Sequence, residues 1–172
     1  MKKTLYALAL LPGFLLADEV EKHGHIGLAS YALAINYNEP GIKDDALSGF
    51  ALFGGYAFNN NLGFRGTWYS LSHNDFSDVD ATGLEFTLLA GTGLTTEGFR
   101  AYGSLGVYSE RWQSGSASED FSGGMLGLGI GYDWRPVTLE FWVNLRTTSD
   151  YDDFSGLSAT AASGGLGLSM RL

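Results

Sequence analysis

Apolar and polar residues alternate with a period of two along most of the chain. The alternation falls into runs of about 10 to 14 residues, the length that a tilted strand needs to cross a bilayer. Helical periodicity of 3.6 residues is hard to find. Eight runs are predicted as strands: 24–37, 48–58, 62–72, 82–93, 99–112, 121–134, 137–147 and 158–172.

The predicted connections alternate between short and long. Those after the second, fourth and sixth runs are tight: 59–61, 94–98 and 135–136. Those after the first, third, fifth and seventh runs are longer and polar: 38–47, 73–81, 113–120 and 148–157. This rhythm is typical of an up-and-down outer-membrane barrel with short periplasmic turns and long extracellular loops. The sequence therefore predicts a single antiparallel eight-stranded transmembrane β-barrel with both termini in the periplasm.

Each of the later runs has one apolar face. The seventh run opposes Val137, Leu139, Phe141, Val143 and Leu145 to Thr138, Glu140, Trp142, Asn144 and Arg146. The last run opposes Leu166, Leu168, Met170 and Leu172 to Gly165, Gly167, Ser169 and Arg171. The first run is ambiguous, because Ile26 and Leu28 share one face while Tyr31, Leu33, Ile35 and Tyr37 share the other.

Alternation alone also fits a soluble, lipocalin-like ligand-binding barrel, whose apolar face points inward. The composition of the polar faces favours the membrane. A face turned to water is expected to carry many lysines and glutamates, yet the predicted strands contain no lysine. Their polar faces hold glycine, serine and threonine with a few charges of both signs, which suits a narrow filled lumen.

The first segment resembles a secretory signal peptide. Lys2 and Lys3 precede an apolar run, and Ala17 supplies a small residue for cleavage. The run is too short for a membrane-spanning helix, which argues against an N-terminal anchor. We therefore divide the chain into a signal peptide, 1–17, and a barrel domain, 18–172.

The charge and the cysteine count exclude several classes of partner. The formal net charge is −9, and removal of Lys2 and Lys3 with the leader makes the chain still more acidic. This balance argues against nucleic acid. Cysteine is absent, which excludes disulfides, thiolate nucleophiles and cysteine metal sites. No cofactor is predicted.

Stretches such as GGYAFNNNLGFRGTWYSLS and FRAYGSLGVYSE resemble the small eight-stranded outer-membrane proteins, the family of outer-membrane protein X with its adhesin relatives and of the outer-membrane protein A barrel. The resemblance implies a monomer surrounded by outer-membrane lipid and lipopolysaccharide. It also implies recognition by the barrel assembly machinery through the last strand. That family usually ends in an aromatic residue, whereas here the expected signal is the row Leu166, Leu168, Met170 and Leu172.

Charged residues on the inward faces are expected to pair across the lumen, because an unpaired buried charge is costly. Counting from the periplasmic turns places Arg65 opposite Glu140, and Glu85 opposite Arg146 in a higher layer. Three further residues, Arg100, Asp133 and Arg171, lie near the lower rim and are expected to join the first layer.

Enzymatic chemistry has little support in the sequence. The resemblance allows a lipid A-modifying enzyme, but a triad of Ser72, His73 and Asp75 would need adjacent residues to face one another. Carboxylates cluster in the long loops, where weak divalent-cation binding is an alternative to a solvated acidic rim. They are Glu39, Asp44, Asp45, Asp75, Asp78, Asp80, Glu119, Asp120, Asp150, Asp152 and Asp153. The predicted role is structural or adhesion-like, through loops that contact an extracellular ligand, without an open pore.

Overall fold

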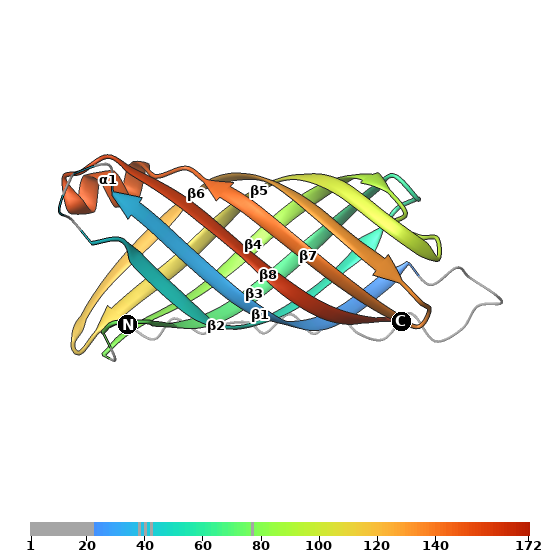
Figure 1. Ribbon diagram of the computed structural model, residues 1–172, viewed down its shortest axis with the longest axis horizontal. Helices are drawn as coiled ribbons and strands as arrows, with labels where there is room; N and C mark the ends of the chain where they lie inside the picture. Colours follow the sequence, from blue (N-terminus) through green and yellow to red (C-terminus); the bar gives the residue numbers. More distant parts are fainter. Residues whose placement is uncertain (1–22, 38, 40, 42, 77) are drawn as a thin grey trace, which may run out of the picture.

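The computed structural model describes residues 23–37, 39, 41, 43–76 and 78–172. They form one closed antiparallel barrel with a short helix at one end (Figure 1). The elements are β1 (Gly24–Tyr37), β2 (Asp45–Ala57), β3 (Leu62–His73), β4 (Val79–Thr92), β5 (Gly98–Ser114), β6 (Ala117–Asp133), β7 (Val137–Arg146), α1 (Ser149–Ser155) and β8 (Ala159–Arg171). The predicted eight-stranded barrel is confirmed.

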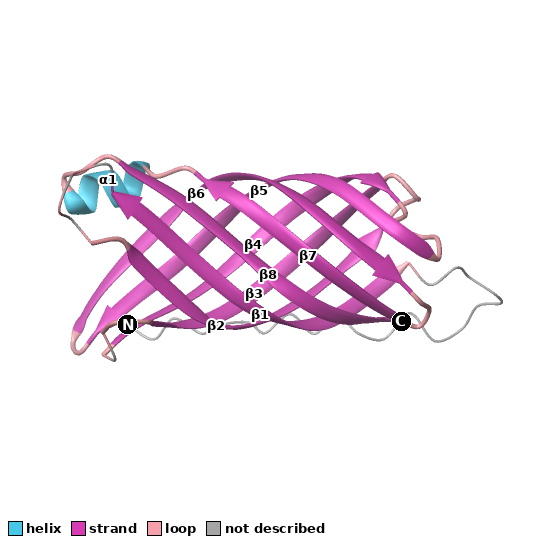
Figure 2. Ribbon diagram, in the orientation of Figure 1, coloured by secondary structure: helices cyan, strands magenta, loops and turns pink. Residues whose placement is uncertain are grey.

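Each strand pairs with its neighbours in sequence, and β1 pairs with β8 to close the cylinder (Figure 2). Leu28 of β1, for example, lies opposite Leu52 of β2 and Leu168 of β8. The helix α1 and the longer connections lie at one end of the barrel, and the C-terminus lies at the other (Figure 1). We call these the loop end and the turn end.

The apolar faces of the strands point outward. Leu126, Leu128 and Ile130 of β6 are 62%, 73% and 53% exposed, and the predicted rows on β7 and β8 also turn outward. Inward positions of the same strands are buried and largely polar, as with Glu140 and Asn144. This arrangement is the reverse of a soluble barrel and matches a barrel that stands in lipid. The lipocalin-like alternative is therefore not supported by the structure.

The ambiguous first strand turns its two apolar sets to different environments. Ile26 and Leu28 point outward, whereas Tyr31, Leu33 and Ile35 are almost completely buried in the lumen. The lumen near the loop end is thus partly apolar, filled by residues that include Leu33, Ile35, Leu47, Leu71 and Phe121. The sequence led us to expect only small residues and paired charges there, and this expectation was incomplete.

Two loop-end connections differ from the prediction. Strands β5 and β6 continue to Ser114 and from Ala117, so the expected loop 113–120 is a tight hairpin on two long strands. The expected loop 148–157 contains α1, whose Tyr151 is buried. Polar and charged residues at these positions hid the continuing strands, because outside the lipid neither face has to be apolar.

Glycines on inward faces make room for large side chains of neighbouring strands. A Cβ atom added to Gly129 would collide with the ring of Tyr102, and one added to Gly83 would collide with the hydroxyl of Tyr69. The stretch GLGIG at 127–131 lies inside β6. It therefore lines the lumen and forms no phosphate-binding loop, which would have to lead into a helix.

The predicted signal peptide, 1–17, lies outside the described residues and stays a prediction. Among the residues that the structure describes, no helix is long and apolar enough to cross a membrane.

Candidate functional site

The carboxylate of Glu140 lies among two arginines and a tyrosine, which together form the Glu140 cluster. Nη1 of Arg65 lies 3.5 Å from Oε1 of Glu140, and Nη2 of Arg100 lies 4.0 Å from Oε2. The Tyr102 hydroxyl accepts a hydrogen bond from Arg65 at 2.9 Å and donates one to Glu140 at 3.0 Å. Arg65 also lies over the ring of Trp142, with its Cζ 4.3 Å from the ring centroid.

A second group, the Arg146 cluster, surrounds one guanidinium with two carboxylates. Arg146 Nη2 lies 2.7 Å from Glu85 Oε1, and Arg146 Nη1 lies 2.8 Å from Glu110 Oε2. The same guanidinium donates hydrogen bonds to Ser163 and Tyr69. All three charged side chains are 1% exposed or less, so the ion pairs lie fully out of water.

Further hydroxyl donors satisfy the two carboxylates of the Arg146 cluster. The Tyr31 hydroxyl donates a short hydrogen bond to Glu85. Tyr69 and Tyr151 donate to Glu110 at 2.6 and 2.5 Å. Burial raises the pKa of the Tyr151 phenol far above its usual range, and the negative charge of Glu110 raises it further. Tyr151 therefore stays protonated and ties α1 to the lumen.

Asp133 and Arg171 form a separate pair at the turn end. The Arg171 Nη2 and Asp133 Oδ2 atoms lie 2.5 Å apart, and Thr138 donates a hydrogen bond to the same carboxylate. Arg171 also donates to the backbone carbonyl oxygens of Leu94 and Thr95 in the turn before β5. The pair therefore lies with Arg135 and the turn before β5 at the lower rim, whereas Arg100 lies beside Glu140.

Some of the lumen charges named from the sequence lie together in the structure, and other lumen residues were not named. Arg65 with Glu140, and Glu85 with Arg146, lie together in the structure. Glu110 was not among the predicted lumen charges, although it has the same inward parity on β5 as Arg100 and Tyr102. That parity was the signal available in the sequence. The tyrosines were missed because an aromatic ring fits either face of a membrane strand.

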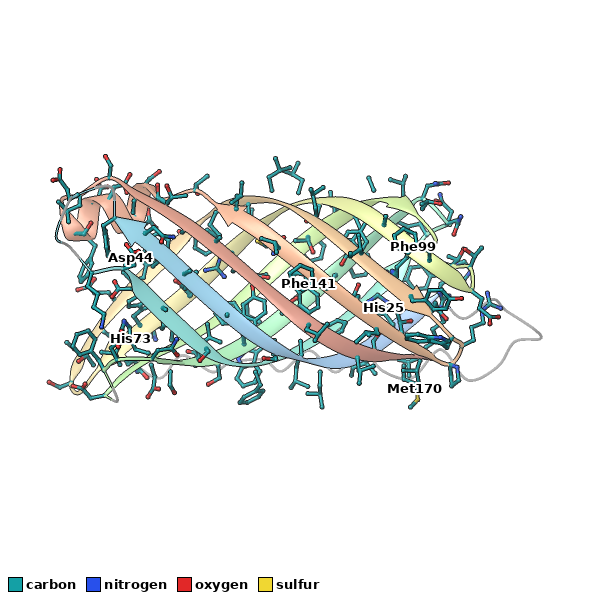
Figure 3. All side chains as sticks on the ribbon, viewed as in Figure 1. His25, Asp44, His73, Phe99, Phe141 and Met170 are labelled. Atoms are coloured by element: carbon teal, nitrogen blue, oxygen red, sulfur yellow. The ribbon has the colours of Figure 1, made fainter. Side chains whose placement is uncertain are left out.

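The four residues of the expected assembly signal lie in one outward row. Leu166, Leu168, Met170 and Leu172 are 54%, 55%, 54% and 64% exposed. Met170 lies at the turn end (Figure 3). Their exposure makes them accessible during insertion, and their recognition by the assembly machinery stays a prediction.

As the sequence led us to expect, Ser72, His73 and Asp75 do not form a Ser-His-Asp triad in the structure. Ser72 is exposed and donates a hydrogen bond to Asp80, whereas the His73 side chain is buried on the opposite face of β3. His73 Nδ1 accepts hydrogen bonds from the backbone N–H groups of Asp75 and Phe76 at 3.1 and 3.2 Å. Neither ring nitrogen is thus available to activate Ser72.

The loop carboxylates gather around the loop end, where Figure 3 labels Asp44 and His73. Of the basic residues that the structure describes, Lys43 and Arg111 lie beside them. Lys43 pairs with Asp75 at 3.0 Å, and Arg111 pairs with Asp120 at 2.6 Å. In the described part of the chain, no three histidine or carboxylate side chains are grouped as metal ligands.

Solved structures provide the comparison with known proteins, since no family model and no curated protein matches the chain. Ail, the attachment invasion locus protein of Yersinia pestis, is 20% identical with a TM-score of 0.55, covering 89% of this chain and 100% of Ail. Neisserial surface protein A is 11% identical with a TM-score of 0.62, covering 87% and 97%. The outer membrane protein OprG from Pseudomonas aeruginosa is 17% identical with a TM-score of 0.53, covering 90% and 99%.

These similarities show the fold of the protein. The closed eight-stranded sheet, the apolar exterior and the charged lumen are those of a transmembrane β-barrel of the bacterial outer-membrane type. More narrowly, the chain has the fold of the small eight-stranded barrels that include Ail, Neisserial surface protein A and OprG.

Proposed function

We propose that this barrel is a non-enzymatic surface-interaction protein that presents its loop end to the cell exterior. The proposal is supported by the contrast between the lumen and the loop end. The lumen is filled by buried side chains such as Trp142, Tyr31 and Tyr69, which favours a rigid support over a pore. The loop end gathers exposed carboxylates on a long β5–β6 hairpin and around α1.

The charge of the loop end limits the partner. The name of Ail refers to attachment, and Ail has been solved with sucrose octasulfate, a heparin analogue. The loop end of the present chain carries many carboxylates, and its described basic residues, Lys43 and Arg111, are already paired with two of them, so it would repel such a polyanion. A partner with positive charge is complementary to this surface.

The proposal is tested by adhesion of whole cells. A non-adherent Gram-negative strain would display the wild-type chain or a variant with Asp44→Asn, Asp78→Asn and Asp153→Asn, three exposed loop residues. Glu97→Gln changes an exposed carboxylate of a turn at the other end and is the matched control. Barrel levels are compared on unheated gels.

We expect wild type and Glu97→Gln to increase adhesion to positively charged surfaces, and the triple variant to lose most of the gain. Adhesion no greater than that of the parent strain would contradict the proposal. A purely structural role would instead appear as a change in envelope integrity on deletion.

A further inference from the structure

A cleft of about 300 Å³ opens at the loop end between the β2–β3 side of the barrel and the β5–β6 hairpin. We call it the loop cleft. Its walls include the aromatic side chains of Phe76, Trp112 and Phe154. The Trp112 indole is held in place, because its Nε1 donates to Glu110 at 2.9 Å and its ring packs on Phe121 with centroids 5.5 Å apart. Trp112 therefore supplies a fixed part of the aromatic wall, whereas Phe76 and Phe154 are more than half exposed.

Two carboxylates line the loop cleft, those of Asp45 and Glu119, and none of the lining residues is lysine or arginine. Asp45 accepts hydrogen bonds from the Tyr37 hydroxyl at 2.6 Å and from His73 Nε2 at 3.0 Å. Glu119 is exposed at the rim.

Both ring nitrogens of His73 have hydrogen-bond partners. Two backbone N–H groups donate to its Nδ1, so the ring proton lies on Nε2 and is donated to Asp45. The Tyr37 hydroxyl is the second donor. Asp45 thus accepts hydrogen bonds from two side chains, neither of them lysine or arginine, at the wall of an aromatic cleft.

We propose that the loop cleft binds a small organic cation, a free ammonium compound with an apolar body. Carboxylates attract the ammonium group, and the faces of aromatic rings add cation–π attraction. The volume lies at the lower end of the range for small-molecule sites, which suits one aromatic ring with a short chain. The inference rests on the proposed outward orientation of the loop end and specifies the chemistry that this end recognises.

The experiment uses three probes of nearly equal size: phenethylammonium, neutral 2-phenylethanol and anionic phenylacetate. The full barrel is refolded in nanodiscs of zwitterionic phospholipid and labelled with 5-fluorotryptophan. The fluorine resonance of Trp112, assigned with Trp112→Phe, reports the cleft. The resonance of Trp142 in the lumen serves as an internal control, because this side chain is 1% exposed.

We expect phenethylammonium to shift the Trp112 signal in a saturable way and to leave Trp142 unchanged. Binding of 2-phenylethanol should be weaker by roughly fivefold, the size of a cation–π contribution at an exposed site, and phenylacetate should not bind. Glu119→Gln should weaken phenethylammonium binding by about two- to fivefold, whereas Glu97→Gln should leave it unchanged. Glu119 is exposed, so its replacement leaves folding intact.

Equal affinity for the ammonium and the alcohol would overturn the proposal, as would preferred binding of phenylacetate or the absence of a saturable shift. Failure of this proposal is distinguishable from failure of the proposed function. Adhesion without probe binding removes the loop cleft as a cation site, and probe binding without adhesion removes the adhesion role alone.

Discussion

Replacement of Arg146 by methionine should destabilise the barrel far more than the same replacement of Arg111. Arg146 pairs with Glu85 and Glu110 at 2.7 and 2.8 Å, and Arg111 pairs with Asp120 at 2.6 Å. The distances are nearly equal, so geometry does not separate the two sites. Burial does, because Arg146 is 0% exposed and Arg111 is 56% exposed.

The expected magnitudes follow from this difference in burial. Breaking a buried pair costs about 3–5 kcal/mol, since the remaining charge is left unpaired. Arg146→Met strands two such carboxylates, so the free energy of unfolding should fall by at least ~3 kcal/mol. Solvent screens an exposed ion pair, so Arg111→Met should leave the free energy of unfolding nearly unchanged.

The assay is urea unfolding in lipid vesicles, followed by tryptophan fluorescence and by mobility on unheated gels. A triple variant with Arg146→Met, Glu85→Gln and Glu110→Gln carries no lone charge and should recover part of the lost stability. Equal losses for Arg146→Met and Arg111→Met would refute the reasoning, as would a triple variant no more stable than Arg146→Met alone.

Three further predictions concern the lumen, the C-terminus and the last loop. Glu140→Gln should lower the free energy of unfolding by about 3–5 kcal/mol. Adding Arg65→Met should restore only part of this stability, because Arg100 remains 4.0 Å from Glu140. Additive losses in urea unfolding would mean that Arg65 and Glu140 are not coupled. Leu172→Phe should preserve or improve insertion and Leu172→Asp should impair it, whereas equal yields of folded barrel would exclude a role in assembly. Replacing 148–157 by a tight turn should leave a heat-modifiable barrel. Its free energy of unfolding should be lower by about 1–3 kcal/mol, because the hydrogen bond from Tyr151 to Glu110 is lost. Loss of the heat-modifiable band would contradict this prediction.

The strands were predictable from the sequence because lipid demands one apolar face. That demand holds within the bilayer, where β7 begins at Val137 and ends at Arg146, within one residue of the predicted run. It ends at the membrane surface. The β5–β6 hairpin and α1 lie beyond the predicted membrane-spanning runs. The polar sequence around Asp120 and Asp150 has no periodic pattern that would distinguish a strand or a helix from a loop.

The side chains that point into the lumen were less predictable, because their packing depends on their shape as well as on their charge. Counting residues from the turns placed Arg65 opposite Glu140, and the structure has their side chains 3.5 Å apart. Counting did not separate the Asp133–Arg171 pair from the Glu140 cluster, because the turn before β5 folds under the barrel and its carbonyl oxygens hold Arg171. Apolar lumen residues such as Leu33 look identical in sequence to lipid-facing ones.

The central claim, that the chain is a small closed barrel of the outer membrane, is tested most directly by cell fractionation followed by gels of unheated and heated samples. We expect the protein to be found in the outer-membrane fraction. Its unheated form should migrate differently from the heated form, because the closed sheet resists detergent until it is boiled. Recovery in the soluble periplasmic fraction, or identical migration of the two samples, would contradict the account.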